Sequence, residues 1–258
     1  MERRGLVLGE PFEGGYASAL VAPAVTAEGD EVVLKVQEPH REDEHEAAAL
    51  ELWDGDGAIR LLDHEPGEHA LLLERCTPGT PLSAAGAETA LDVLVELLPR
   101  LWKPAGSPFG TLAAEAERWA GSLEASWERS GRPFQRLLLD VALEALRELP
   151  STQREQVLLN QDLHGDNVLA AQREPWLVID PKPLVGEREF GIAPIVRSRE
   201  LGHSRHDVLA RFDRLTGELG LDRDRARRWT IGQTIAWAFD GDHRETHVET
   251  SRWLLEAA

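Results

Sequence analysis

The feature that most constrains the fold is a polar run set between short apolar segments. The run from Asn160 to Asn167 separates two such segments, and a third segment, Trp176–Ile179, ends at Asp180. Each apolar segment is too short for a stable helix, and its composition favours a β-strand. We therefore expect a short loop followed by a hairpin, which together bring Asp162, Asn167 and Asp180 to one place.

The spacing of these three residues matches the catalytic set of kinases. In that set, an Asp accepts the proton of the attacking hydroxyl, while an Asn five residues later and an Asp at a later strand end bind magnesium. Asp162, Asn167 and Asp180 occur in this order. Magnesium prefers oxygen ligands, which Asn167 and Asp180 supply. The Asp–Asn spacing alone is weakly specific, and the following Asp makes the match more specific.

The amino-terminal part predicts a buried ion pair. Kinases hold the phosphates with a strand Lys that pairs with a Glu of the next helix. Lys35 lies in the strand-like segment Glu31–Val36, and only three of the 28 basic residues are Lys. The helical pattern of residues 41–53 puts Glu46 on the apolar face, where an unpaired charge would be costly. We expect Lys35 to pair with Glu46, or else with Glu42. The other interpretation is an exposed Lys and an ordinary helix Glu.

The order of elements predicts an α+β chain of two lobes, divided at a turn-rich break that follows Cys76. Residues 1–76 would form a small antiparallel sheet with one helix, and residues 77–258 a larger helical lobe. Strand patterns occur at Tyr16–Val21, Glu31–Val36, Ile59–Asp63, Ala70–Glu74, Val157–Leu159, Val168–Leu169 and Trp176–Ile179. Helical apolar stripes cover Leu91–Trp102, Leu112–Trp127, Phe134–Leu149 and two tail segments at about 206–219 and 222–239.

Composition excludes several classes of protein. Asp plus Glu number 46 against 28 Lys plus Arg, a formal net charge of −18, which repels nucleic acids and anionic membranes. The same charge favours a cationic small-molecule partner, or it merely keeps the chain soluble. One Cys excludes a disulfide framework, and neither a leader pattern nor a run of about 20 apolar residues occurs. We expect a cytoplasmic monomer or homodimer.

Several motifs together carry a resemblance to a known family. They are P-F-E-G-G-Y (11–16), V-V-L-K (32–35), H-E-A-A-A-L-E-L-W-D-G-D-G-A-I-R-L-L (45–62), L-L-L-E-R-C-T-P-G-T-P-L (71–82), D-L-H-G-D-N-V-L (162–169) and W-L-V-I-D-P-K-P-L-V-G-E (176–187). The chain from about Gly5 onward resembles the aminoglycoside phosphotransferase group, and within it the streptomycin 6-kinase and hydroxyurea-resistance kinase branch. The resemblance implies a bilobal protein-kinase-like fold, ATP as the phosphoryl donor, Mg²⁺, and a small acceptor that bears a hydroxyl.

The resemblance also implies a role for each matching residue. Asp162 would be the catalytic base, and Asn167 and Asp180 the magnesium ligands. Lys35 would hold the phosphates and Glu46 would anchor Lys35. The segment from Glu74 to Cys76 would be the hinge that offers backbone groups to adenine. The loop over the phosphates would contain Gly14, Gly15 and Ser18.

Two positions depart from the family pattern. The residues expected to contact the acceptor are chosen by their charge. Asn160 stands where His is usual two residues before the base, and Gly191 stands where the branch usually has Asp. Lys182 would contact phosphate or acceptor, or else be an ordinary surface Lys. Carboxylates that would face a cationic acceptor are Glu187 first, then Glu189, Asp207, Asp213 and Asp240.

The expected activity is transfer of the γ-phosphoryl group of ATP to a hydroxyl of an aminoglycoside such as streptomycin. An alternative acceptor is hydroxyurea, an amino sugar or another small metabolite. An alternative of another class is a nucleotide-binding protein without catalysis.

Overall fold

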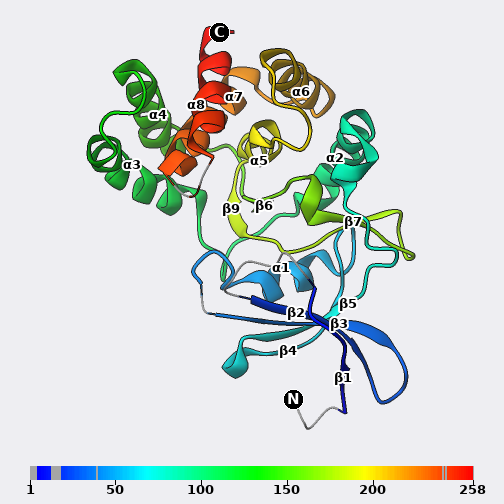
Figure 1. Cartoon of the computed structure of the whole chain (residues 1–258). Coiled ribbons are helices and arrows are strands. Elements are labelled where there is room, and N and C mark those ends of the chain that lie inside the picture. Colours follow the sequence, from blue (N-terminus) through cyan, green and yellow to red (C-terminus); the bar gives the residue numbers. More distant parts are fainter. Residues whose placement is uncertain (1–4, 13–18, 39, 240, 242, 258) are drawn as a thin grey trace.

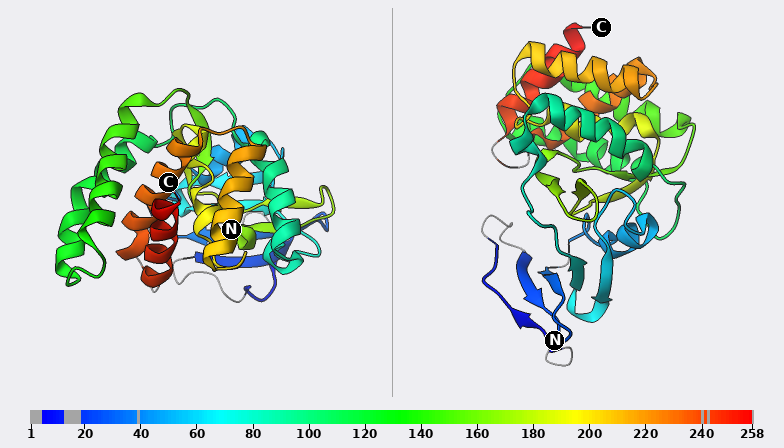
Figure 2. Two further views of the ribbon diagram at one scale, coloured as in Figure 1. Left: turned by 90° about the horizontal axis from the view of Figure 1, so that it is seen from above. Right: turned by 90° about the vertical axis from the view of Figure 1, so that its right-hand side faces the viewer.

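The computed structural model describes residues 5–12, 19–38, 40–239, 241 and 243–257, which form a sheet lobe and a helical lobe (Figure 1). Gly14, Gly15, Ser18 and Asp240 lie outside the described residues. Figure 2 shows the two lobes from two further sides, with the sheet below the helices in its right-hand view.

A five-stranded antiparallel sheet forms the first lobe. Its strands are β1 (Val7–Leu8), β2 (Ala19–Val25), β3 (Glu31–Gln37), β4 (Leu61–Glu65) and β5 (Ala70–Glu74), in the order β1-β2-β3-β5-β4. Because β3 is the central strand, Lys35 lies between Val21 of β2 and Leu71 of β5. Its neighbours leave it only 6% exposed.

Helix α1 (Glu46–Trp53) buries the face that carries its apolar side chains. Glu46, Ala49, Leu50 and Trp53 are buried, at the spacing of one helical face. The expectation that this helix begins at residue 41 is wrong, because residues 41–45 form turns. The Glu46 N–H donates to Asp43 O within these turns.

Helices dominate the second lobe. They are α2 (Ala87–Leu101), α3 (Leu112–Arg129), α4 (Arg136–Glu148), α5 (Ala193–Arg197), α6 (Arg205–Glu218), α7 (Arg223–Ala236) and α8 (Arg244–Glu256). The predicted apolar stripes supply most of the buried positions of α2 and α3, as Leu94 and Trp119 illustrate. In α4 the predicted face is partly wrong, because Leu137 is 62% exposed while Leu139 and Leu143 are buried. Helices α5 and α8 were not predicted.

Two short antiparallel pairs stand where the sequence predicted a loop and a hairpin. Strand β6 (Val157–Asn160) pairs with β9 (Pro183–Gly186), and β7 (Val168–Ala170) pairs with β8 (Trp176–Val178). Asn160 lies opposite Pro183, so the segment after β6 runs beside the segment before β9. This pairing brings the residues around Asp162 next to those around Lys182.

None of the helices in the described part of the chain is both long and apolar enough to cross a lipid bilayer.

Candidate active site

Three residues from distant parts of the chain meet between the lobes. The Lys35 ammonium group on β3 lies 2.6 Å from Glu46 Oε2 of α1, and it also bonds to the Asp180 carboxylate that follows β8. Asp180 has a φ of 49°, a left-handed conformation that is uncommon for residues other than Gly. The structure therefore gives Lys35 the partner predicted from helical periodicity, Glu46 rather than Glu42.

The electrostatics of this cluster favour a charged Lys35. Burial alone would lower the pKa of Lys35, but the Glu46 and Asp180 carboxylates outweigh burial and raise it. Burial raises the pKa of Glu46 to about 7, against the opposing effect of Lys35. A cation held in this way is suited to bind phosphate oxygens. Of the two carboxylates that contact it, Asp180 is more exposed than Glu46.

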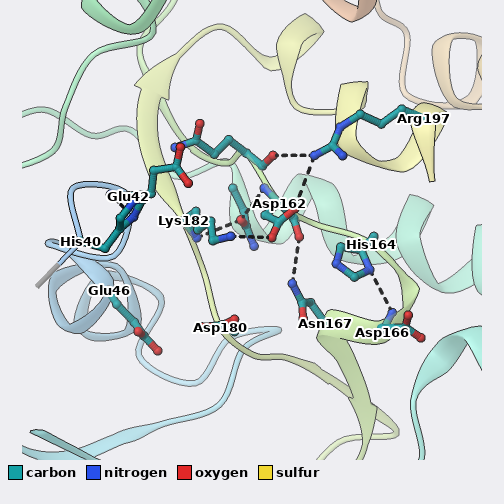
Figure 3. Close-up of polar contacts among 12 residues, drawn as sticks. His40, Glu42, Glu46, Asp162, His164, Asp166, Asn167, Asp180, Lys182 and Arg197 are labelled. Carbon is teal, nitrogen blue, oxygen red and sulfur yellow. Dashed lines mark hydrogen bonds and ion pairs between the residues drawn. The ribbon is translucent and has the colours of Figure 1, made fainter. Parts of the chain in front are cut away.

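Asp162 lies in the loop after β6 with two cations beside its carboxylate (Figure 3). Lys182 Nζ is 2.9 Å from Asp162 Oδ2, and Arg197 Nη2 is 3.4 Å from Asp162 Oδ1. Burial alone would raise the pKa of Asp162, but Lys182, Arg197 and His164 together outweigh burial and lower it. Asp162 is therefore ionised at neutral pH, as a proton acceptor must be.

Asn167 is oriented by the backbone of the same loop. Its Nδ2 donates to the backbone oxygen of Asp162 at 3.1 Å, which leaves the side-chain oxygen to face another group. Asn167 and Asp180 are also joined through the backbone, because the N–H of Ile179 donates to Asn167 O at 2.9 Å. The donor chemistry of an amide oxygen and a carboxylate fits Mg²⁺, which prefers oxygen ligands.

Residues 7–241 match the family described as aminoglycoside/hydroxyurea antibiotic resistance kinase. The chain belongs to this family. It is 42% identical over 242 residues to hydroxyurea phosphotransferase of Kitasatospora aureofaciens, an alignment that covers 91% of this chain and 69% of that protein. It is 37% identical over 233 residues to streptomycin 6-kinase of Streptomyces griseus, covering 86% of this chain and 76% of that protein.

A solved structure has the same fold. A thermostable mutant of the aminoglycoside phosphotransferase APH(4)-Ia has a TM-score of 0.65 and 15% identity, covering 97% of this chain and 96% of that chain. At that identity the likeness concerns the fold alone. Together with the family match, it confirms the predicted fold class and the predicted class of enzyme, a small-molecule phosphotransferase.

Asn160, the first of the two departures expected from the resemblance, has a structural role. Its Oδ1 accepts hydrogen bonds from the backbone N–H of Asp162 at 3.0 Å and of Lys182 at 3.1 Å. Asn160 is 5% exposed, so these bonds are shielded from water. One side chain thus ties the strand that precedes the base to the segment that carries Lys182.

Gly191, the second departure, makes room for an aromatic ring. A Cβ atom at this position would lie 2.8 Å from Trp102 Nε1 and 3.2 Å from Arg188 O. Real side chains do not approach each other so closely. The space that an Asp side chain would fill is therefore occupied here by the Trp102 indole.

The predicted hinge residues lie at the end of β5. Glu74 is the last residue of that strand, and its carboxylate accepts from Arg173 Nε at 2.8 Å and from the Arg60 N–H at 2.9 Å. Cys76 is partly buried, and burial raises the pKa of its thiol to about 11. The side chains are thus engaged or neutral, and any adenine contact here falls to the backbone. Gly14, Gly15 and Ser18 lie outside the described residues.

Glu187 is not available to an acceptor in this structure, which corrects the expectation placed on it. Its side chain is fully buried, and Oε1 accepts from Arg225 Nε at 2.5 Å and from the Trp229 indole. Both partners come from α7, so Glu187 joins the end of β9 to that helix. Asp207 and Asp213 are also engaged structurally, by Ser204 in a helix cap and by Arg223.

Sequence reasoning missed two residues that shape the catalytic loop. Arg197 of α5 contacts Asp162 and stacks 4.2 Å from the centre of the Trp237 ring. Glu200 accepts from the Gly165 N–H at 2.9 Å and lies 3.4 Å from His164 Nδ1. Burial alone would raise the pKa of Glu200, but the bond with His164 and the backbone N–H groups, the Gly165 N–H among them, together outweigh burial and lower the pKa to about 2. Arg197 and Glu200 each lie 35 residues from the loop residue that they contact, so no local spacing reveals them.

Proposed function

We propose that this protein transfers the γ-phosphoryl group of ATP to a hydroxyl of a cationic small molecule, an aminoglycoside such as streptomycin. The observation that carries the proposal is the meeting of Lys35, Glu46 and Asp180 between the lobes. Asp162 stands on the neighbouring loop, ionised and oriented. These are the parts that a kinase needs for its donor and for its attacking hydroxyl.

In this proposal Asp162 accepts the proton of the acceptor hydroxyl. The hydroxyl oxygen bonds to the γ-phosphorus, and the bond to the bridging oxygen of ADP breaks. Lys35 holds phosphate oxygens, and Glu46 keeps its ammonium group in position. Asn167 and Asp180 would hold Mg²⁺, which neutralises phosphate charge when bound. Lys182 and Arg197 keep Asp162 ionised until the proton arrives.

Hydroxyurea is a second candidate acceptor, since a relative named hydroxyurea phosphotransferase is 42% identical to this chain. An amino sugar or another small metabolite is a further alternative. We place the reaction in the cytoplasm, where ATP is available, and we expect the enzyme to act as a monomer or homodimer.

The test is ATP consumption by purified protein with magnesium across a panel of acceptors. The panel holds streptomycin, other aminoglycosides, hydroxyurea and amino sugars, with Asp162→Asn as the control. We expect streptomycin-dependent turnover that is lost in the variant. Turnover with hydroxyurea and with no other compound would show that the acceptor is hydroxyurea and not an aminoglycoside. A thermal shift with magnesium and ATP but no turnover with any acceptor would favour the non-catalytic alternative and contradict the proposal.

A further inference from the structure

A cavity of about 130 Å³ lies beside the catalytic loop, between the turns that precede α1 and the start of α3. Residues from both lobes line it. They are Arg41, Glu42, Glu44, His45, Gly110, Thr111, Ala114, Glu115, Gln161, Pro183 and Leu184. A water molecule takes up about 30 Å³ in the liquid, so the cavity has the volume of about four water molecules. A group of four non-hydrogen atoms therefore has room in it.

The cavity adjoins the residues of the proposed phosphoryl transfer. Gln161 precedes Asp162, and the Cα atoms of neighbouring residues are about 3.8 Å apart. Pro183 follows Lys182, whose ammonium group contacts Asp162. Figure 3 shows Glu42 on the same side of Asp162 as Lys182. A molecule seated in the cavity therefore has its remaining atoms within reach of the catalytic base.

Gln161 offers a hydrogen-bond acceptor that the protein leaves unused. Its side chain is 1% exposed, and its Oε1 has no hydrogen-bond partner among the described residues. A buried acceptor without a partner costs free energy. An occupant of the cavity that donates a hydrogen bond would remove this cost.

Glu42 supplies a charge that the surrounding residues do not neutralise by direct contact. Three carboxylates line the cavity, those of Glu42, Glu44 and Glu115. Glu115 is held by Arg41 Nη2 at 2.8 Å and by Arg118 Nε at 3.1 Å. Glu42 is partly buried and forms no ion pair with any described residue. Burial raises the pKa of Glu42, and the charge of Lys182 opposes this only in part.

We infer that the cavity binds a cationic, donor-rich substituent of the acceptor, a guanidinium or ammonium group, through Glu42 and Gln161. This inference rests on the proposed function and names the part of the acceptor that is recognised. A guanidinium group has four non-hydrogen atoms and only donors, so it matches a cavity of this size with a carboxylate and an amide oxygen. The recognition site then lies one residue from the base along the chain.

The first test measures binding without turnover. Streptomycin, which bears guanidinium groups, is titrated by calorimetry into wild type, Glu42→Gln and Glu51→Gln without ATP. Glu42→Gln keeps the side-chain shape and removes the charge. Glu51→Gln makes the same change at an exposed position of α1. We expect about tenfold weaker binding for Glu42→Gln, as for loss of one charge-assisted contact, and no change for Glu51→Gln.

Equal affinity of wild type and Glu42→Gln, or no binding of streptomycin to wild type, would overturn the inference. A second readout is inhibition by methylguanidinium, which should compete with the acceptor in wild type and not in Glu42→Gln. In steady-state assays Glu42→Gln should raise the KM for the acceptor and leave the KM for ATP unchanged. Binding that depends on Glu42 without any phosphoryl transfer would support the cavity while rejecting the proposed function.

Discussion

The proposed donor side and the proposed acceptor side of the site are built differently. The donor side joins Lys35 and Glu46, which are eleven residues apart, to Asp180 in a compact cluster of opposite charges. The acceptor side draws Gln161, Glu42 and Glu115 from three separate elements, and Gln161 has an unpaired buried oxygen. The donor side serves a phosphate group that all kinases share, whereas the acceptor side must fit one particular molecule. This difference explains why a family match identifies the reaction before it identifies the substrate.

The largest expected effect separates the chemical step from donor binding. Asp162→Asn removes the proton acceptor while keeping a side chain of similar shape. We expect kcat to fall by about 10²–10⁴-fold, the range for loss of a general base, with nearly unchanged ATP affinity. Steady-state kinetics and calorimetric titration of ATP measure the two quantities. A large loss of ATP affinity would mean that the two sides are not separable.

The next effect concerns the residue that holds the base in place. Asn160→Ala leaves the buried N–H groups of Asp162 and Lys182 without their acceptor. We expect a loss of about 1–3 kcal/mol in the free energy of unfolding and a lower kcat. Hydrogen exchange at these two amides should speed up. Gln156→Ala, an exposed amide just before β6, is the control. Unchanged exchange at Asp162 and Lys182 would show that Asn160 does not hold the loop.

A smaller effect is expected on the donor side. Glu46→Gln keeps a hydrogen-bonding group beside Lys35 and removes the charge that anchors it. We expect the KM for ATP to rise by about tenfold, equivalent to about 1.4 kcal/mol, while the KM for the acceptor stays constant. Glu51→Gln on the exposed face of the same helix should change neither value. A rise in the acceptor KM instead would contradict the division of the site.

The smallest effect is a shift along the pH axis. Burial alone would raise the pKa of Asp162, and Lys182 is the first of the cations that lower it. Lys182→Met should therefore raise this pKa and move the acidic limb of the kcat/KM profile to higher pH. Lys182→Arg keeps the cation, so its acidic limb should lie at the same pH as that of wild type. An acidic limb at the same pH in all three proteins would show that Lys182 does not control the ionisation of Asp162.

The sequence predicted the catalytic residues and the donor side better than it predicted the acceptor side. Asp162, Asn167 and Asp180 fall within one short stretch, and strand and hairpin geometry then brings them together. Lys35 and Glu46 were predictable because a charge on an apolar helix face requires a partner. These signals are local and depend on spacing alone.

The remaining parts of the site depend on contacts that no spacing encodes. Glu187 stands next to the catalytic motifs, yet its partners Arg225 and Trp229 lie 38 and 42 residues further along the chain. Arg197 reaches Asp162 from 35 residues away. The start of α1 was placed too early because Glu42 falls one helical turn before Glu46, although residues 41–45 form turns. The fold of the second lobe determines these features, and one sequence does not reveal them.

The proposed phosphoryl transfer is tested most directly by following label from γ-³²P-ATP to streptomycin. The reaction is run with magnesium, by wild type and by Asp162→Asn. We expect labelled streptomycin from wild type and a rate at least about 10²-fold lower from the variant. Equal labelling by both proteins, or no labelled acceptor from a wild type that binds ATP, would contradict this proposal.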